Sequence, residues 1–106
     1  MESGIACTDL MQFMASGAEM ALIDIRNPVE FDRLQVFRST NLPLPTLEKR
    51  ISSLVPLKQT PIVLCDADGT YACRSARLLR RYGYARAVHL VGGLAALHRG
   101  RPAVRR

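Results

Sequence analysis

Cys65 and Asp66 are adjacent residues whose side chains can do chemistry, and they directly follow the apolar run 61–64. A cysteine thiolate is a nucleophile that can carry a transferred group. A carboxylate before a helix can accept hydrogen bonds from the backbone N–H groups of the first turn. A polar segment separates the apolar run from a stretch with helical periodicity, so we expect a candidate active-site or anion-binding loop. Its residues are Asp66, Ala67, Asp68, Gly69, Thr70 and Tyr71.

The position of Asp66 before the predicted helix favours it as the residue that faces the loop. Successive side chains of a strand point to opposite faces, which would turn Cys65 away from the loop interior. We therefore interpret Cys65 as a structural residue, and a catalytic Cys65 remains the alternative because a bulge at the strand end could redirect it. We expect the Asp66 carboxylate inside the loop, stabilised by about 0.3–1 kcal/mol or more. The alternative is a turn residue that points to solvent.

Three further charged residues are candidates for the rim of a pocket around this loop: Asp24, Arg26 and Arg74. We predict that Asp24 is structural and binds backbone N–H groups of the turn 27–30. Arg26 either holds the rim or is a solvated surface arginine. The two histidines lie apart with no acidic residue nearby, and the three cysteines form no Cys-x-x-Cys pair, so we expect no metal and no cofactor.

Short apolar segments alternate with helical patterns along the chain, which predicts a parallel sheet covered on both faces. We expect strands at 21–25, 61–65 and 87–90 and an extended, proline-containing segment at 41–45. Helices are expected over about 9–16, 28–31, 46–54, 70–82 and 94–98, with Thr8 as the N-cap of the first. Asp68-Gly69 is a turn dipeptide, and Gly92-Gly93 is expected to serve backbone geometry rather than phosphate binding.

Composition is that of one small domain, which we place at residues 1–106 with a basic, frayed tail at 101–106. No apolar run approaches about 18 residues, which excludes a membrane span. The odd number of cysteines and the lack of a secretory signal favour the reducing cytoplasm. All nine acidic residues lie at or before Asp68, whereas nine arginines follow Gly69. This uneven charge is expected to attract anions to the last third of the chain.

Four stretches, taken in order, resemble the rhodanese homology domain. They are 22–26 (Leu-Ile-Asp-Ile-Arg) with Glu30-Phe31, 41–45 (Asn-Leu-Pro-Leu-Pro), 61–83, and 88–94 (Val-His-Leu-Val-Gly-Gly-Leu). The resemblance covers nearly the whole chain. It implies a three-layer α/β fold, with a central parallel sheet of about five short strands and helices on both faces.

In that family a cysteine begins the loop after the central strand and carries sulfur as a persulfide inside a ring of backbone N–H groups. Anchoring the family pattern on Gly69 and Gly83 places Asp66, and not Cys65, at the position of that nucleophile. The string that begins at Cys73 imitates a rhodanese loop, but it would need a buried strand in the polar segment 68–72. The resemblance therefore points to family members that carry Asp in place of Cys and do not transfer sulfur.

Three functions follow from these observations. The first is a catalytically impaired rhodanese-like module that binds an anionic sulfur compound or an acidic protein and regulates sulfur-related metabolism. The second is an active thiosulfate or persulfide sulfurtransferase that uses Cys65 as its persulfide-forming nucleophile. The third is a basic accessory domain that contacts nucleic acid through Arg74, Arg77, Arg81 and the tail. No aromatic residues interleave with these arginines to stack on bases, so nucleic acid is the weakest expectation.

Overall fold

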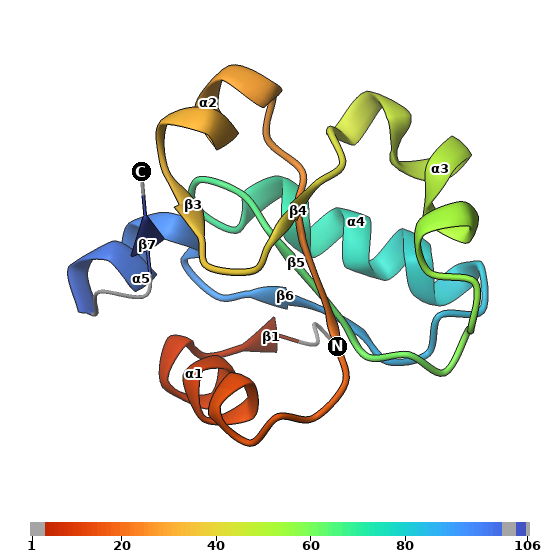
Figure 1. Cartoon of the computed structure of the whole chain (residues 1–106). Helices are drawn as coiled ribbons and strands as arrows, with labels where there is room; N and C mark the ends of the chain where they lie inside the picture. Colours follow the sequence, from red (N-terminus) through yellow and green to blue (C-terminus); the bar gives the residue numbers. More distant parts are fainter. Residues whose placement is uncertain (1–3, 101–103, 106) are drawn as a thin grey trace.

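The computed structural model describes residues 4–100 and 104–105, and its centre is a sheet of five parallel strands (Figure 1). The spatial order is β1-β6-β5-β2-β4, so β5 is the middle strand. The strands are β1 (Gly4–Ile5), β2 (Ala21–Asp24), β4 (Thr40–Asn41), β5 (Ile62–Cys65) and β6 (Ala87–Leu90). All residues of β5 are buried, as expected for a strand that is covered on both faces. The predicted α/β fold with about five short parallel strands is confirmed.

One face of the sheet is covered by α3 (Leu47–Leu54) and α4 (Thr70–Arg81). The apolar side of α4 consists of Ala72, Ala76 and Leu79, each fully buried. These small and branched side chains pack with alternate strand residues, among them Ile23, Ile62 and Leu64. The arginines of α4 lie on its other side, so the helix is positioned by the burial of its apolar stripe.

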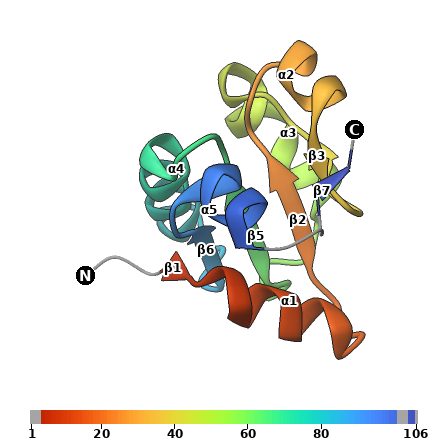
Figure 2. The same cartoon turned by 90° about the vertical axis from the view of Figure 1, so that its left-hand side faces the viewer.

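The opposite face is covered by α1 (Cys7–Ala15) and α5 (Gly93–Gly100), which gives the three layers visible in Figures 1 and 2. A second hydrophobic core lies on this face. It contains Leu10 of α1, Leu94 and Leu97 of α5, and the strand residues whose side chains point to this face. Those strand residues are Leu22, Val63, Cys65 and Leu90. The period-two alternation along β2 and β5 thus divides the core into two clusters.

The shorter elements lie outside the central sheet. They are α2 (Pro28–Arg33), the 3-10 helix η1 (Leu44–Thr46), and the antiparallel pair of β3 (Gln35–Val36) and β7 (Val104–Arg105). Asn27 caps α2, because its side chain accepts a hydrogen bond from the Glu30 amide at 2.9 Å.

Three local expectations differ from the structure. Ala6, and not Thr8, is the N-cap of α1, and Thr8 lies inside the helix. Residues 44 and 45, expected to be extended, belong to η1, which is closed by a hydrogen bond from the Thr46 amide to the Pro43 carbonyl. Part of the tail that was expected to fray, residues 104–105, pairs with β3, while 101–103 and 106 lie outside the described residues.

Within the described part of the chain, no helix is both long and apolar enough to cross a membrane.

Candidate functional site

The site lies at the carboxyl edge of the sheet, where the turns after the parallel strands come together. Asp24 at the end of β2 pairs in register with Cys65 at the end of β5, and with Asn41 at the end of β4. The Asn41 side chain donates to the carbonyls of Asp24 and Arg26 at 3.0 and 2.9 Å. In open parallel sheets this edge is where ligands bind.

The loop after β5 closes around the carboxylate of Asp66. One carboxylate oxygen, Oδ1, accepts from the Gly69 amide at 2.5 Å. The other, Oδ2, accepts from the amides of Tyr71 and Ala72 at 2.8 and 3.1 Å. Asp66 is buried, so the structure places its carboxylate inside the loop at the N-terminus of α4, as the sequence predicts. A ring of three inward-facing N–H groups at a helix N-terminus is an anion-binding arrangement, and here the anion belongs to the chain.

Backbone geometry specific to glycine holds the loop in this shape. Gly69 precedes α4 with a φ of 93°, a left-handed conformation that glycine adopts without strain. Asp68 stabilises the turn, since its Oδ1 accepts a hydrogen bond from the Thr70 amide at 3.0 Å. Hydrogen bonds with Thr70 lower the pKa of the Asp68 carboxyl. Asp68 and Gly69 therefore form the turn that the dipeptide predicts.

The Gly92-Gly93 segment, far away in the sequence, packs directly against the loop. A Cβ atom at Gly93 would lie 2.5 Å from the Asp66 carbonyl oxygen and 2.6 Å from the Asp68 nitrogen. The first residues of α5 continue the contact, because the Leu94 amide donates to the Asp66 carbonyl at 2.9 Å. The double glycine thus has the role in backbone geometry that was expected of it, and Gly93 does so by allowing a close approach to the loop.

Cys65 faces the opposite layer from the loop amides. It is completely buried among the residues of the α1–α5 core, next to Val63 and Leu94 of the same cluster. Burial raises the pKa of the Cys65 thiol, and the neighbouring Asp24 carboxylate raises that pKa further. Both effects disfavour the thiolate, which is the reactive form of cysteine.

Asp24 and Arg26 form a buried ion pair beside the loop. The Arg26 guanidinium donates to both carboxylate oxygens of Asp24 at 2.8 to 3.2 Å, and the Arg26 amide donates to Oδ1 at 2.9 Å. The Asp24 side chain is fully buried and that of Arg26 is 11% exposed. The Arg26 guanidinium also donates to the Leu34 carbonyl. The prediction that Asp24 binds the N–H groups of the turn 27–30 is therefore wrong. Asp24 binds Arg26 instead, and the Asn27 side chain caps that turn.

The remaining candidates lie on the outside of α4. Arg74 is exposed, and none of the described contacts joins it to Asp24 or Arg26. Tyr71 at the mouth of the loop is 57% exposed. Among the described residues, no group of three or more His, Cys, Asp or Glu side chains could hold a metal ion. The structure thus brings Asp24, Arg26 and the loop to one edge and leaves Arg74 on the helix surface.

Sequence reasoning missed the way in which Arg26 folds back over Asp24. The Asp-x-Arg spacing is the only signal for it, because the bidentate contact depends on the turn between the two residues. It also missed that Leu94 and the next residue of α5 hydrogen-bond the loop backbone. These contacts join segments that lie more than twenty residues apart.

The sequence of the chain is similar to that of a known domain family. The chain matches the family model described as rhodanese-like domain over residues 7–99. The probable adenylyltransferase/sulfurtransferase MoeZ of Mycobacterium tuberculosis is 28% identical over 95 residues, which cover 89% of this chain and 24% of that relative. A sulfurtransferase of Allochromatium vinosum is 29% identical over 96 residues, which cover 91% of this chain and 88% of that relative. The chain therefore spans about a quarter of the MoeZ protein and most of the second relative.

Solved structures match the same fold. The crystal structure of a thiosulfate sulfurtransferase from Pseudomonas aeruginosa has a TM-score of 0.84 and 30% identity, covering 92% of this chain and 18% of that one. With the family model matching most of its length, this chain belongs to the family of rhodanese-like domains, and its relatives include sulfurtransferases.

Proposed function

We propose that this chain is a rhodanese-like module that does not carry sulfur and instead binds an acidic protein partner, as a regulator in sulfur-related metabolism. One observation carries the proposal: the Asp66 carboxylate accepts hydrogen bonds from three loop amides. In an active family member those amides would surround a cysteine persulfide. In this chain the Asp66 carboxylate already accepts the hydrogen bonds that those amides would donate to a persulfide.

The state of Cys65 supports the same proposal. A sulfurtransferase needs a thiolate that can reach its donor and acceptor, whereas the Cys65 thiol is fully buried and has a raised pKa. An active enzyme using Cys65 would need its thiol on the loop side, for example by a shift of β5 by one residue. That shift would also move Leu64 and Val63 out of their two cores, because a slip of one residue exchanges the faces of a strand.

Incubation with thiosulfate followed by intact-mass measurement tests this proposal. We expect the wild-type protein to gain no sulfur, because its loop amides are occupied and its nearest thiol is buried. The matched control is Cys65→Ser, whose mass should behave in the same way. Uptake of one sulfur by the wild type and its loss in Cys65→Ser would show that the domain is an active sulfurtransferase and overturn the proposal. Peptide mapping would separate that result from modification of Cys7 or Cys73.

The proposed partner surface is the basic side of α4. Arg74, Arg77 and Arg81 recur at helical spacing and are exposed, and no acidic residue follows Asp68 in the chain. A helix surface with several exposed arginines favours the approach of an acidic protein segment. This surface begins one turn from the Asp66 loop, so a partner bound there would also cover Tyr71.

Binding of an oligoglutamate peptide tests the partner surface. Reversing two charges of α4, with Arg74→Glu and Arg81→Glu, is expected to weaken binding about ten-fold, as two exposed pairs at about 0.7 kcal/mol each would give. The matched control, Arg33→Glu with Arg50→Glu, changes the net charge equally but on α2 and α3. If both double variants weaken binding to the same extent, only net charge matters and the α4 surface is not the partner site.

A further inference from the structure

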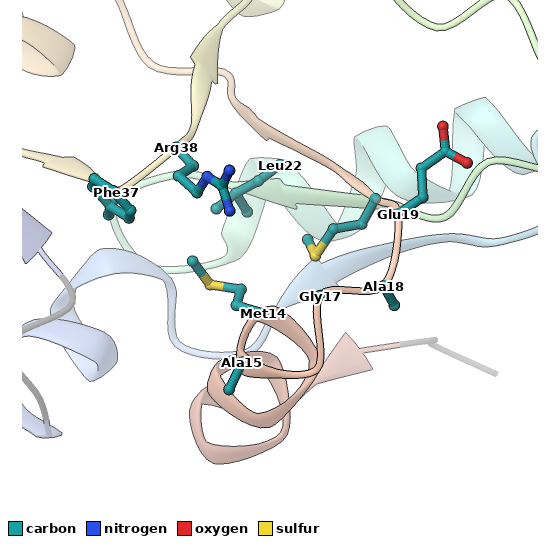
Figure 3. Close-up of a pocket in the computed structure, with 9 residues that line it drawn as sticks. Met14, Ala15, Gly17, Ala18, Glu19, Leu22, Phe37 and Arg38 are labelled. Atoms are coloured by element: carbon teal, nitrogen blue, oxygen red, sulfur yellow. The ribbon is translucent and has the colours of Figure 1, made fainter.

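A hollow of about 530 Å³ lies on the far side of the domain from α4, between the end of α1, the start of β2 and the turn after β3 (Figure 3). Its lining includes the apolar side chains of Met14, Met20, Leu22 and Phe37. Ligand pockets of about 300–1,000 Å³ with mostly apolar walls and a few polar groups hold small organic molecules. Methionine side chains adapt their shape to such ligands and make favourable contacts between sulfur and aromatic rings.

Arg38 provides the charge at this hollow. Its guanidinium extends over the hollow toward Leu22, whereas the carboxylate of Glu19, which also lines the hollow, points away from it (Figure 3). Arg38 stacks near the Phe37 ring, 6.0 Å from the ring centroid. Among the described residues, an ion pair joins Asp24 to Arg26, whereas no carboxylate lies within ion-pair distance of Arg38. The interior of the hollow therefore combines an apolar surface with one positive group.

The backbone at Arg38 is strained in the way that functional residues often are. Its φ is 70°, the only positive φ among the described residues other than glycine. Arg38 is the third residue of a tight turn in which the Ser39 amide donates to the Val36 carbonyl at 3.0 Å. Glycine or asparagine is favoured at this position when φ is positive. An arginine therefore occupies a position where glycine would be less strained, and strained positions of this kind cluster at functional sites.

We propose that this hollow binds a small organic carboxylate with an apolar body. The carboxylate pairs with the Arg38 guanidinium, and the apolar body lies against Met14, Met20 and Phe37. The charge of Arg38, from which the Glu19 carboxylate points away, and the net charge of +6 favour an anion. The site lies apart from the Asp66 loop and does not depend on the function proposed for that loop.

Phenylbutyrate is a suitable probe, and phenylbutanol is its uncharged counterpart. In protein labelled with carbon-13 at the methionine methyl groups, phenylbutyrate is expected to shift the signals of Met14 and Met20 saturably. Met11 lies on α1 but does not line the hollow, so its signal is the internal control. Phenylbutanol should bind about ten-fold more weakly, because it lacks the charge-assisted hydrogen bonds to arginine.

Arg38→Gly separates binding from stability. This substitution removes the guanidinium, so the affinity for phenylbutyrate should fall to that for phenylbutanol. Glycine also adopts the positive φ without strain, so the melting temperature should rise. Arg38→Lys keeps a positive charge and should retain part of the preference for the acid. Arg33→Ala, at an exposed arginine of α2, should change neither property. Equal shifts at Met11 and Met14, or unchanged discrimination in a folded Arg38→Gly variant, would overturn the proposal.

Discussion

Asp66→Cys in a Cys65→Ser background is expected to take up one sulfur atom from thiosulfate, at a rate at least about a hundred-fold above that of the wild type. The new thiol replaces a carboxylate that is surrounded by the amides of Gly69, Tyr71 and Ala72 at the start of α4. Backbone donors and a helix N-terminus lower the pKa of a cysteine and stabilise its thiolate. The measurement is the intact mass of the protein as a function of time with thiosulfate.

The expected reaction is a single displacement. The thiolate introduced by Asp66→Cys attacks the outer sulfur of thiosulfate, a new sulfur–sulfur bond forms, and sulfite leaves with the electron pair of the bond that breaks. The three loop amides then bind the negative charge of the persulfide. The rate of alkylation of the new thiol by iodoacetamide should remain high below the usual pKa of cysteine, since only the thiolate reacts.

Asp66→Ser is the control for this experiment, because it opens the same loop without supplying a thiol. It should gain no sulfur. A folded Asp66→Cys variant that neither gains sulfur nor shows a lowered thiol pKa would mean that the loop amides do not stabilise a thiolate at this position. In that case Asp66 does not occupy the position at which the active members of the family hold their persulfide.

Asp24→Ala is expected to lower the free energy of unfolding by about 3 kcal/mol, because it leaves the Arg26 guanidinium largely buried without its carboxylate. The pair is mostly shielded from solvent, with Asp24 fully buried and Arg26 11% exposed at the side chain. Removal of Asp24 also takes the acceptor from the Arg26 amide. Urea unfolding measured by circular dichroism gives the change in free energy.

Asp32→Ala is the matched control, since Asp32 is an exposed acidic residue on α2 that follows closely in the chain. It should change stability by no more than about 0.5 kcal/mol. Combining Asp24→Ala with Arg26→Met should recover part of the loss, because the double variant leaves no unpaired charge. A loss as small in Asp24→Ala as in Asp32→Ala would show that the pair does not stabilise the carboxyl edge of the sheet.

Local patterns were sufficient to predict much of this domain. The apolar run of β5, the helical spacing of the alanines in α4 and the glycines that bound that helix predicted the parallel sheet and the loop. The family spacing anchored on Gly69 and Gly83 predicted that Asp66 faces the loop, and strand alternation then predicted that Cys65 turns away from it. These features follow from side-chain periodicity and backbone freedom, which act between residues close together in the chain.

Contacts between distant segments were decided only by the tertiary structure. Gly93 approaches the loop backbone so closely that no side chain fits, and the double glycine alone did not indicate which segment it would meet. The pairing of residues 104–105 with β3 was likewise hidden, because two-residue strands carry no periodic signal. The hollow beside Arg38 was also not predictable, since it exists only where α1, β2 and the turn after β3 meet. Sequence periodicity thus determined which face each residue of the sheet presents, whereas the folding of the chain onto itself determined which segments meet there.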